Sequence, residues 1–154
     1  MRIIKYLAFL SLLLLPACSS LILKPADFAW PVESVLKVDS TGNVNIQRYS
    51  ITFNSQELFL EETKDSSAYK NQQLRVIRNT NGFYFMTAEN FKNVYVFKVN
   101  KGDFSLDNKI EISDSTGMQN PAFNQRPPYI QLVYDNSKKV NLTENGIVRE
   151  EAKK

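Results

Sequence analysis

Short runs of β-branched and aromatic residues, separated by asparagine, aspartate, glycine and serine, fill most of the chain after residue 31. Such runs are typical of strands bounded by turns, and no stretch shows a convincing helical stripe. The pattern predicts an all-β fold: an antiparallel β-sandwich or partly open barrel of about 8–10 short strands. The expected strands are Ser34–Val38, Val44–Phe53, Glu57–Glu61, Leu74–Arg78, Phe83–Thr87, Val94–Val99, Phe104–Leu106 with Lys109–Ile112, Tyr129–Tyr134 and Val140–Leu142, with Ile147–Arg149 as a further candidate.

Tight turns between these runs predict antiparallel neighbours, because so short a loop cannot make a parallel crossover. Asn81-Gly82 is a strong hairpin signal, since both residue types tolerate positive φ. Lys101-Gly102-Asp103, Asp135-Asn136-Ser137 and Asn145-Gly146 predict further turns of the same kind. The runs around Phe83 and Val94 are apolar on both faces, which places them at the centre of two packed sheets.

The tetrapeptide Asp-Ser-Thr-Gly occurs twice, at 39–42 and 114–117. It is compatible with a fold of propeller-blade-like β repeats, which we keep as the alternative fold. The residues that follow the two copies differ, and Asp, Ser and Gly are ordinary turn residues. We therefore favour repeated turn chemistry over a repeated domain.

Two long polar stretches, Thr63–Gln73 and Ser113–Pro128, are expected to be loops. The second ends in Pro127-Pro128 and carries an aromatic residue and an arginine, residue types enriched where proteins bind one another. We predict a partner surface formed by Phe123, Arg126 and Tyr129. The alternative is that Phe123 packs into the core and anchors the loop.

The N-terminus has the features of a secretory signal peptide. Arg2 and Lys5 precede an apolar run, 6–15, that is too short to cross a bilayer, and Leu15-Pro16-Ala17-Cys18 follows it. These four residues resemble the lipobox of bacterial lipoproteins. The resemblance implies cleavage between Ala17 and Cys18, a diacylglycerol thioether on Cys18, and an acyl chain such as palmitate on the new N-terminus. Ser19 then favours the outer membrane, facing the periplasm, over the inner membrane.

The expected organisation is a cleaved signal peptide (1–17), a lipidated cysteine and tether (18–31), one β domain (32–149) and a charged tail (150–154). Phe28 and Trp30 in the tether are candidates for the lipid interface or for one end of the core. The formal charge of +3 includes Arg2 and Lys5, so the mature chain is nearly neutral. The charge gives no reason to expect nucleic acid as a partner.

Much catalytic chemistry is missing from the sequence. The chain has no histidine, and Cys18 is its only cysteine, so a lipidated form has no residue for a triad, a thiolate or a zinc–histidine site. Carboxylates are the remaining candidates for catalysis or calcium binding, and tyrosines for a sugar- or lipid-binding groove. The residues concerned are Glu61, Glu62, Asp65, Asp103 and Asp107 for catalysis, Asp39, Asn43, Asp103 and Asp107 for calcium, and Tyr84, Tyr95, Tyr129 and Tyr134 for the groove.

Three hypotheses about function follow. The first is a membrane-anchored, non-enzymatic envelope lipoprotein that acts as an accessory or structural component and binds an envelope protein. The second is a periplasmic module that binds glycan, lipid or peptidoglycan in an aromatic groove. The third, a carboxylate-dependent hydrolase, requires its acidic residues to converge. We expect no metal and no cofactor other than the covalent lipid.

Overall fold

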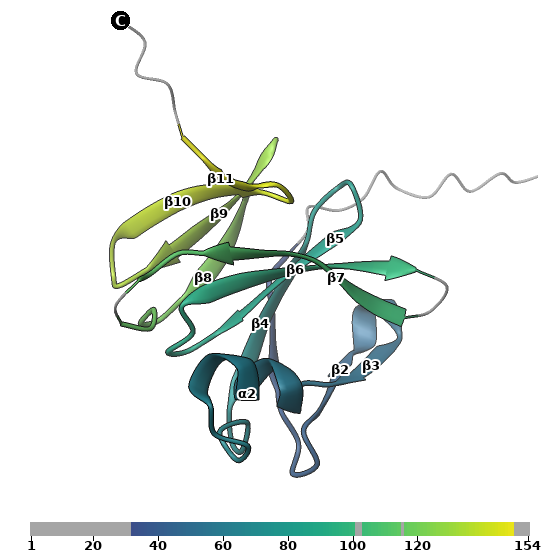
Figure 1. Cartoon of the computed structure of the whole chain (residues 1–154). Coiled ribbons are helices and arrows are strands. Elements are labelled where there is room, and N and C mark those ends of the chain that lie inside the picture. The colour runs from purple at the N-terminus through teal and green to yellow at the C-terminus, as the bar shows by residue number, and fades with distance from the viewer. Residues whose placement is uncertain (1–31, 101–102, 115, 150–154) are drawn as a thin grey trace, which may run out of the picture.

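The structure is a computed structural model, and it describes residues 32–100, 103–114 and 116–149 (Figure 1). The described residues form eleven strands in three antiparallel sheets, one more than the upper end of the expected number, and none of the sheets closes into a barrel. The all-β, antiparallel prediction is confirmed. The first sheet has the order β1 (Ser34–Lys37), β4 (Gln73–Arg78), β5 (Phe83–Ala88), β6 (Asn93–Asn100), β7 (Asp103–Glu111). The second sheet has the order β11 (Gly146–Val148), β10 (Lys138–Thr143), β9 (Tyr129–Tyr134), β8 (Ala122–Arg126). The third sheet pairs β2 (Asn43–Ile46) with β3 (Ile51–Asn54).

The five-stranded sheet is covered on both faces (Figure 1). The four-stranded sheet packs on one face, with β8 near β4 and β11 near β7. The β2–β3 hairpin and a short helix, α2 (Gln56–Thr63), lie on the other. Strands β5 and β6 occupy the middle of the sheet, and Phe85 and Val96 are fully buried there, as their two-sided apolar pattern predicts. Sheets of five, four and two strands are not equivalent blades, so the propeller alternative is dropped.

Two glutamates join the sheets where the backbone turns. The Glu33 carboxylate, just before β1, accepts hydrogen bonds from Arg75 Nη1 of β4 at 2.9 Å and from the Phe123 backbone N–H of β8 at 2.8 Å. Glu144, in the turn between β10 and β11, accepts from Asn79 and Asn81 in the turn between β4 and β5. Each glutamate therefore fixes one end of the four-stranded sheet to the five-stranded sheet.

The predicted hairpin turns are confirmed where the structure describes them. Gly82 has φ +88° between β4 and β5, and Asp135 and Asn136 have φ +48° and +66° between β9 and β10. Gly146 has φ +135° after Asn145. Residues 101–102 of the Lys101-Gly102-Asp103 turn lie outside the described residues. Local turn chemistry thus sets the antiparallel order of these strands.

The two Asp-Ser-Thr-Gly copies use their glycines differently. In the first, the Asp39 carboxylate accepts hydrogen bonds from the backbone N–H groups of Thr41 and Asn43, and Gly42 has φ +83°. In the second, a Cβ on Gly117 would lie 2.0 Å from the backbone oxygen of Asn90, so the glycine permits a close backbone approach. The shared letters therefore mark two unrelated turns.

The expected strand Glu57–Glu61 is wrong, because these residues form α2. The Asn54 side-chain oxygen accepts the Gln56 backbone N–H at the start of the helix, and Lys64 ends it with φ +61°. Phe59 is 2% exposed whereas Leu60 is 43% exposed, which is the reverse of what an inward-facing Leu58–Leu60 strand requires.

Two other segments also differ from expectation. Val44–Phe53 is not one strand, since the 3-10 turn η2 (Gln47–Tyr49) and Ser50, with φ +53°, fold it into the β2–β3 hairpin. The two short segments expected at Phe104 and Lys109 form the single strand β7, whose pairing with β6 shifts register at Val96 and Phe97 and leaves Asp107 unpaired in a bulge. The bulge coincides with the gap between the two expected segments, Phe104–Leu106 and Lys109–Ile112.

Candidate functional site

A cleft of about 830 Å³ separates the β2–β3 hairpin from the outer strand of the five-stranded sheet, and we call it the β3–β7 cleft. Its lining comes from β3 and the first residues of β7, from β5 and β6, and from α2 at one end. The lining residues are Ile51, Thr52, Phe53, Asn54, Ser55, Glu57, Leu58, Glu61, Met86, Tyr95, Phe97, Asp103, Phe104 and Leu106.

The two walls meet through aromatic side chains and not through backbone pairing. Phe53 of β3 and Phe104 of β7 have ring centroids 5.3 Å apart. Phe104 also contacts Tyr84 at 4.9 Å and Phe97 at 6.0 Å, both edge-on. Within the described residues, β3 pairs only with β2, and β7 only with β6. Each of these two strands, both of which contribute to the cleft lining, therefore has one backbone edge without a described strand partner.

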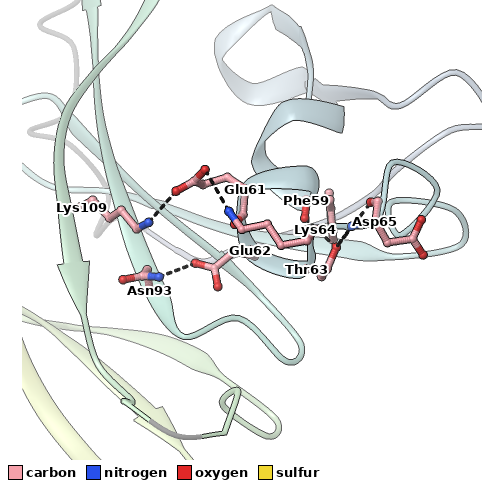
Figure 2. Close-up of polar contacts among 8 residues, drawn as sticks. All are labelled: Phe59, Glu61, Glu62, Thr63, Lys64, Asp65, Asn93 and Lys109. Carbon is pink, nitrogen blue, oxygen red and sulfur yellow. Dashed lines mark hydrogen bonds and ion pairs between the residues drawn. The ribbon is translucent and has the colours of Figure 1, made fainter.

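Helix α2 is fixed at one end of the cleft by two of its three glutamates, Glu61 and Glu62 (Figure 2). The Glu61 carboxylate accepts a hydrogen bond from Lys109 Nζ of β7 at 2.8 Å. The Glu62 carboxylate accepts from Asn93 Nδ2 at 2.7 Å and from the Lys92 backbone N–H at 2.9 Å. These bonds hold the helix to the β6–β7 side of the sheet.

The cleft carries negative charge at both ends. Glu57 and Glu61 line it at the helix and Asp103 at the start of β7, while no lysine or arginine belongs to its lining in the described chain. The hydrogen bond from Lys109 holds the pKa of Glu61 below its usual range, so this carboxyl stays ionised. Burial raises the pKa of the Tyr95 hydroxyl, and the nearby Glu62 carboxylate adds to the shift.

A smaller hollow adjoins the cleft at Ile51 and has the opposite charge. Its volume is about 410 Å³, and Arg78 and Lys98 line it. The Arg78 guanidinium lies over the rings of Tyr49 and Tyr84, with 5.5 Å and 5.6 Å to the ring centroids. This arginine rigidifies the aromatic cluster between hairpin and sheet.

The structure does not assemble the predicted partner surface as expected. Phe123 is 3% exposed, so its place on an exposed loop is wrong and the alternative, that it packs into the core, is confirmed. The expected Ser113–Pro128 loop is also wrong in part, because 122–126 form β8. Arg126 and Tyr129 are cross-strand partners at the end of the β8–β9 hairpin, around a cis Pro127-Pro128 turn.

The other candidate groups are dispersed. Glu61 and Asp103 both line the β3–β7 cleft, whereas Glu62 bonds to Asn93 and Lys92 and Asp107 lies in the β7 bulge. The Asp65 carboxylate accepts a hydrogen bond from the Ser67 backbone N–H and so caps its own turn. No group of three or more acidic, histidine or cysteine residues in the described part of the chain is placed to hold a metal ion, so the calcium candidates Asp39, Asn43, Asp103 and Asp107 do not assemble such a group.

The four tyrosines do not form one groove. Tyr95 lines the β3–β7 cleft, and Tyr84 lines the smaller hollow. Tyr129 and Tyr134 belong to β9, in the other sheet, where Tyr134 is buried. These tyrosines therefore do not line one shared groove, and phenylalanines supply most of the aromatic surface of the cleft.

Comparison with known proteins gives no match: no family model, no curated protein sequence and no solved structure is similar to this chain. Cys18, Ala17, Phe28 and Trp30 lie outside the described residues. Among 32–100, 103–114 and 116–149, no helix is long and apolar enough to span a bilayer. The predicted signal peptide and the β3–β7 cleft are therefore the features that bear on function.

Proposed function

We propose that this chain is a lipid-anchored, non-enzymatic component of the bacterial cell envelope whose β domain binds an envelope protein. The resemblance of 15–18 to a lipobox supports anchoring through Cys18, and Ser19 favours the outer membrane facing the periplasm. The observation that carries the binding proposal is the β3–β7 cleft, which combines two free strand edges with an aromatic lining and a few charged groups. Clefts of this composition are typical recognition sites.

The carboxylates favour binding over hydrolysis. A carboxylate pair needs one member with a raised pKa to act as the acid. Lys109 instead lowers the pKa of Glu61, and Glu62 is bonded to Lys92 and Asn93. Within this proposal the acidic residues act as fixed charges that select a ligand.

A second candidate function is glycan or lipid binding in the same cleft. The aromatic lining of Phe53, Phe97 and Phe104 favours it, since aromatic faces pack against sugar rings and acyl chains. A thermal-shift screen with envelope glycans, peptidoglycan fragments and lipid vesicles separates the two candidates. A saturable stabilisation by one of these ligands, lost when Phe104 is replaced by serine, would favour this second function.

The test of the first function is capture of the intact protein after crosslinking in its own cells. The chains compared are the wild type, Cys18→Ser, and a cleft variant in which Glu57→Gln and Asp103→Asn are combined. Glu111→Gln is the matched control, because this carboxylate is exposed at the far end of β7. We expect one envelope protein in near-equal amount with the wild type and the control, and much less with the other two chains.

Two results would overturn the proposal. If the Cys18→Ser chain stayed bound to the membrane and had lost no lipid mass relative to the wild type, the proposed lipid anchor at Cys18 would be wrong. Recovery of the same partner by the cleft variant, or of no envelope protein by any chain, would remove the binding role of the cleft.

A further inference from the structure

We propose that the β3–β7 cleft receives an extended, lysine- or arginine-bearing peptide segment of a partner protein, which pairs with the free edge of β7 as an added strand. This inference deepens the proposed function and rests on it, because it names the part of the partner that the cleft binds.

The backbone edges fit an added strand. The free edge of β3 spans the four residues Ile51–Asn54, and all four line the cleft. On β7, Asp103, Phe104 and Leu106 line the cleft, and the bulge at Asp107 follows them. A bulge bends a strand and interrupts regular pairing, so the flat edge of β7 is also about four residues long. Unpaired edges of this kind are where extended peptides add to sheets.

The side chains at this edge supply an apolar surface. Leu106 is 54% exposed, one of the most exposed large hydrophobic residues in the described chain. Phe104, Phe53 and Phe97 are partly buried against the core and lie beside it in the cleft. In an added strand, alternate side chains point to the same face, so every second residue of the peptide would pack on this surface.

The charges select a cationic segment. Glu57 and Asp103 form no ion pair with another described residue, and Glu61 is shared between Lys109 and Lys64. An anionic lipid surface or an acidic glycan would meet repulsion from these three carboxylates. A peptide that alternates apolar and basic residues satisfies both the aromatic surface and the charge, which is why we favour it over a membrane or a sugar.

The experiment pans a random octapeptide display library on the whole chain as purified from cells. We expect enrichment of peptides that alternate apolar with lysine or arginine residues. The best peptide is then synthesised with both ends capped. Three altered copies are made with it: two are N-methylated at alternate backbone nitrogens, one in each of the two possible registers, and one carries glutamate at its basic positions. Affinity is measured by calorimetry at low and at high salt.

The expected results follow from the geometry. N-methylation removes the donors that pair with a strand edge, so one of the two possible methylation registers should weaken binding at least tenfold. Asp103→Asn and Glu57→Gln should each weaken it about two- to fivefold, as for other exposed ion pairs, and the Glu111→Gln control should not. Bound peptide should also protect the amides of 51–54 and 103–106 from hydrogen exchange.

Enrichment of acidic peptides, or of none above the uncoated support, would overturn the inference. So would full affinity in both methylation registers, which would show side-chain binding without strand addition. These outcomes are distinct from failure of the proposed function, since partner capture in cells can fail with the peptide still bound. If capture succeeded and depended on the cleft but no basic peptide was enriched, only the inference about the peptide would be rejected, and the proposed function would stand.

Discussion

Glu33 provides the sharpest test of how the two large sheets are joined. Its side chain is only 16% exposed, and its two oxygens accept from different sheets: one from Arg75 Nη1 and the other from the Phe123 backbone N–H. Replacing it with alanine removes two charge-assisted hydrogen bonds and leaves the Phe123 amide without an acceptor in a partly buried place. A glutamine, by contrast, keeps the shape of the side chain.

The expected magnitude follows from these contacts. An unsatisfied buried amide costs about 1–3 kcal/mol, and the loss of the bond to Arg75 adds less, about 1 kcal/mol, because Arg75 is 27% exposed and regains water. We expect Glu33→Ala to lower the free energy of unfolding by about 2–4 kcal/mol. Glu33→Gln should lower it by about 1–2 kcal/mol, because both partners are donors and the amide has only one acceptor oxygen to offer them.

The assay is urea unfolding followed by circular dichroism, with Glu111→Gln as the control expected to change stability by less than about 0.5 kcal/mol. The slope of the free energy of unfolding against urea concentration should stay the same, since the native fold is unchanged. The reasoning would be refuted if Glu33→Ala matched the control, or if glutamine were as harmful as alanine.

The remaining predictions concern a glycine and the pH dependence of stability. Gly117→Ala should lower the free energy of unfolding, measured by urea unfolding, by about 3 kcal/mol or more, because its Cβ would meet backbone at 2.0 Å. Gly82→Ala should lower it by about 1–2 kcal/mol, from the positive φ alone. Equal losses from the two substitutions would refute this. The Gln119 backbone N–H and Lys138 lower the pKa of Asp135 below its ordinary 3.8, so its contribution is present above that value and lost as pH falls through the folded pKa. Asp135 in turn raises the pKa of Lys138 above 10.5, so this contribution is lost only as pH rises through the higher value. Because the chain has no histidine, the midpoint of thermal unfolding should be nearly constant from about pH 6 to 9. Asp135→Asn should reduce the fall of this midpoint at acid pH. An unchanged fall would contradict the role assigned to Asp135.

Local chemistry accounts for what could be predicted from the sequence. The Asn81-Gly82 and Asn145-Gly146 turns and the two-sided apolar strands β5 and β6 each depend on a few neighbouring residues, and these predictions are confirmed. The prediction of Phe123 as an exposed contact failed because its burial depends on β8 docking against β4, some fifty residues earlier in the chain. Nothing in 113–128 alone distinguishes a pinned strand from an open loop.

The candidate site could not be predicted for a related reason. Only single residues of the cleft stood out, such as Glu61 and Asp103, because its walls β3 and β7 are about fifty residues apart and touch through side chains rather than through a ladder. The bulge at Asp107 also depends on register with β6, which the sequence of β7 alone does not specify. The long-range placement of these elements, rather than any motif, creates the cleft.

The helix α2 decides whether the cleft exists, and a pair of substitutions distinguishes it from the strand that its sequence suggests. A strand over 57–61 would lie beside the free edges of β3 and β7 and extend a sheet, whereas the helix spans one end and leaves the edges open. As a helix, α2 buries Phe59 in edge contact with Phe91 at 5.0 Å and exposes Leu60. Phe59→Ala should therefore lower the free energy of unfolding by about 3–5 kcal/mol and Leu60→Ala by less than about 1 kcal/mol, measured by urea unfolding. A strand with Leu58 and Leu60 facing inward requires the opposite order, so a larger loss from Leu60→Ala would contradict the helix and the end wall that it gives to the cleft.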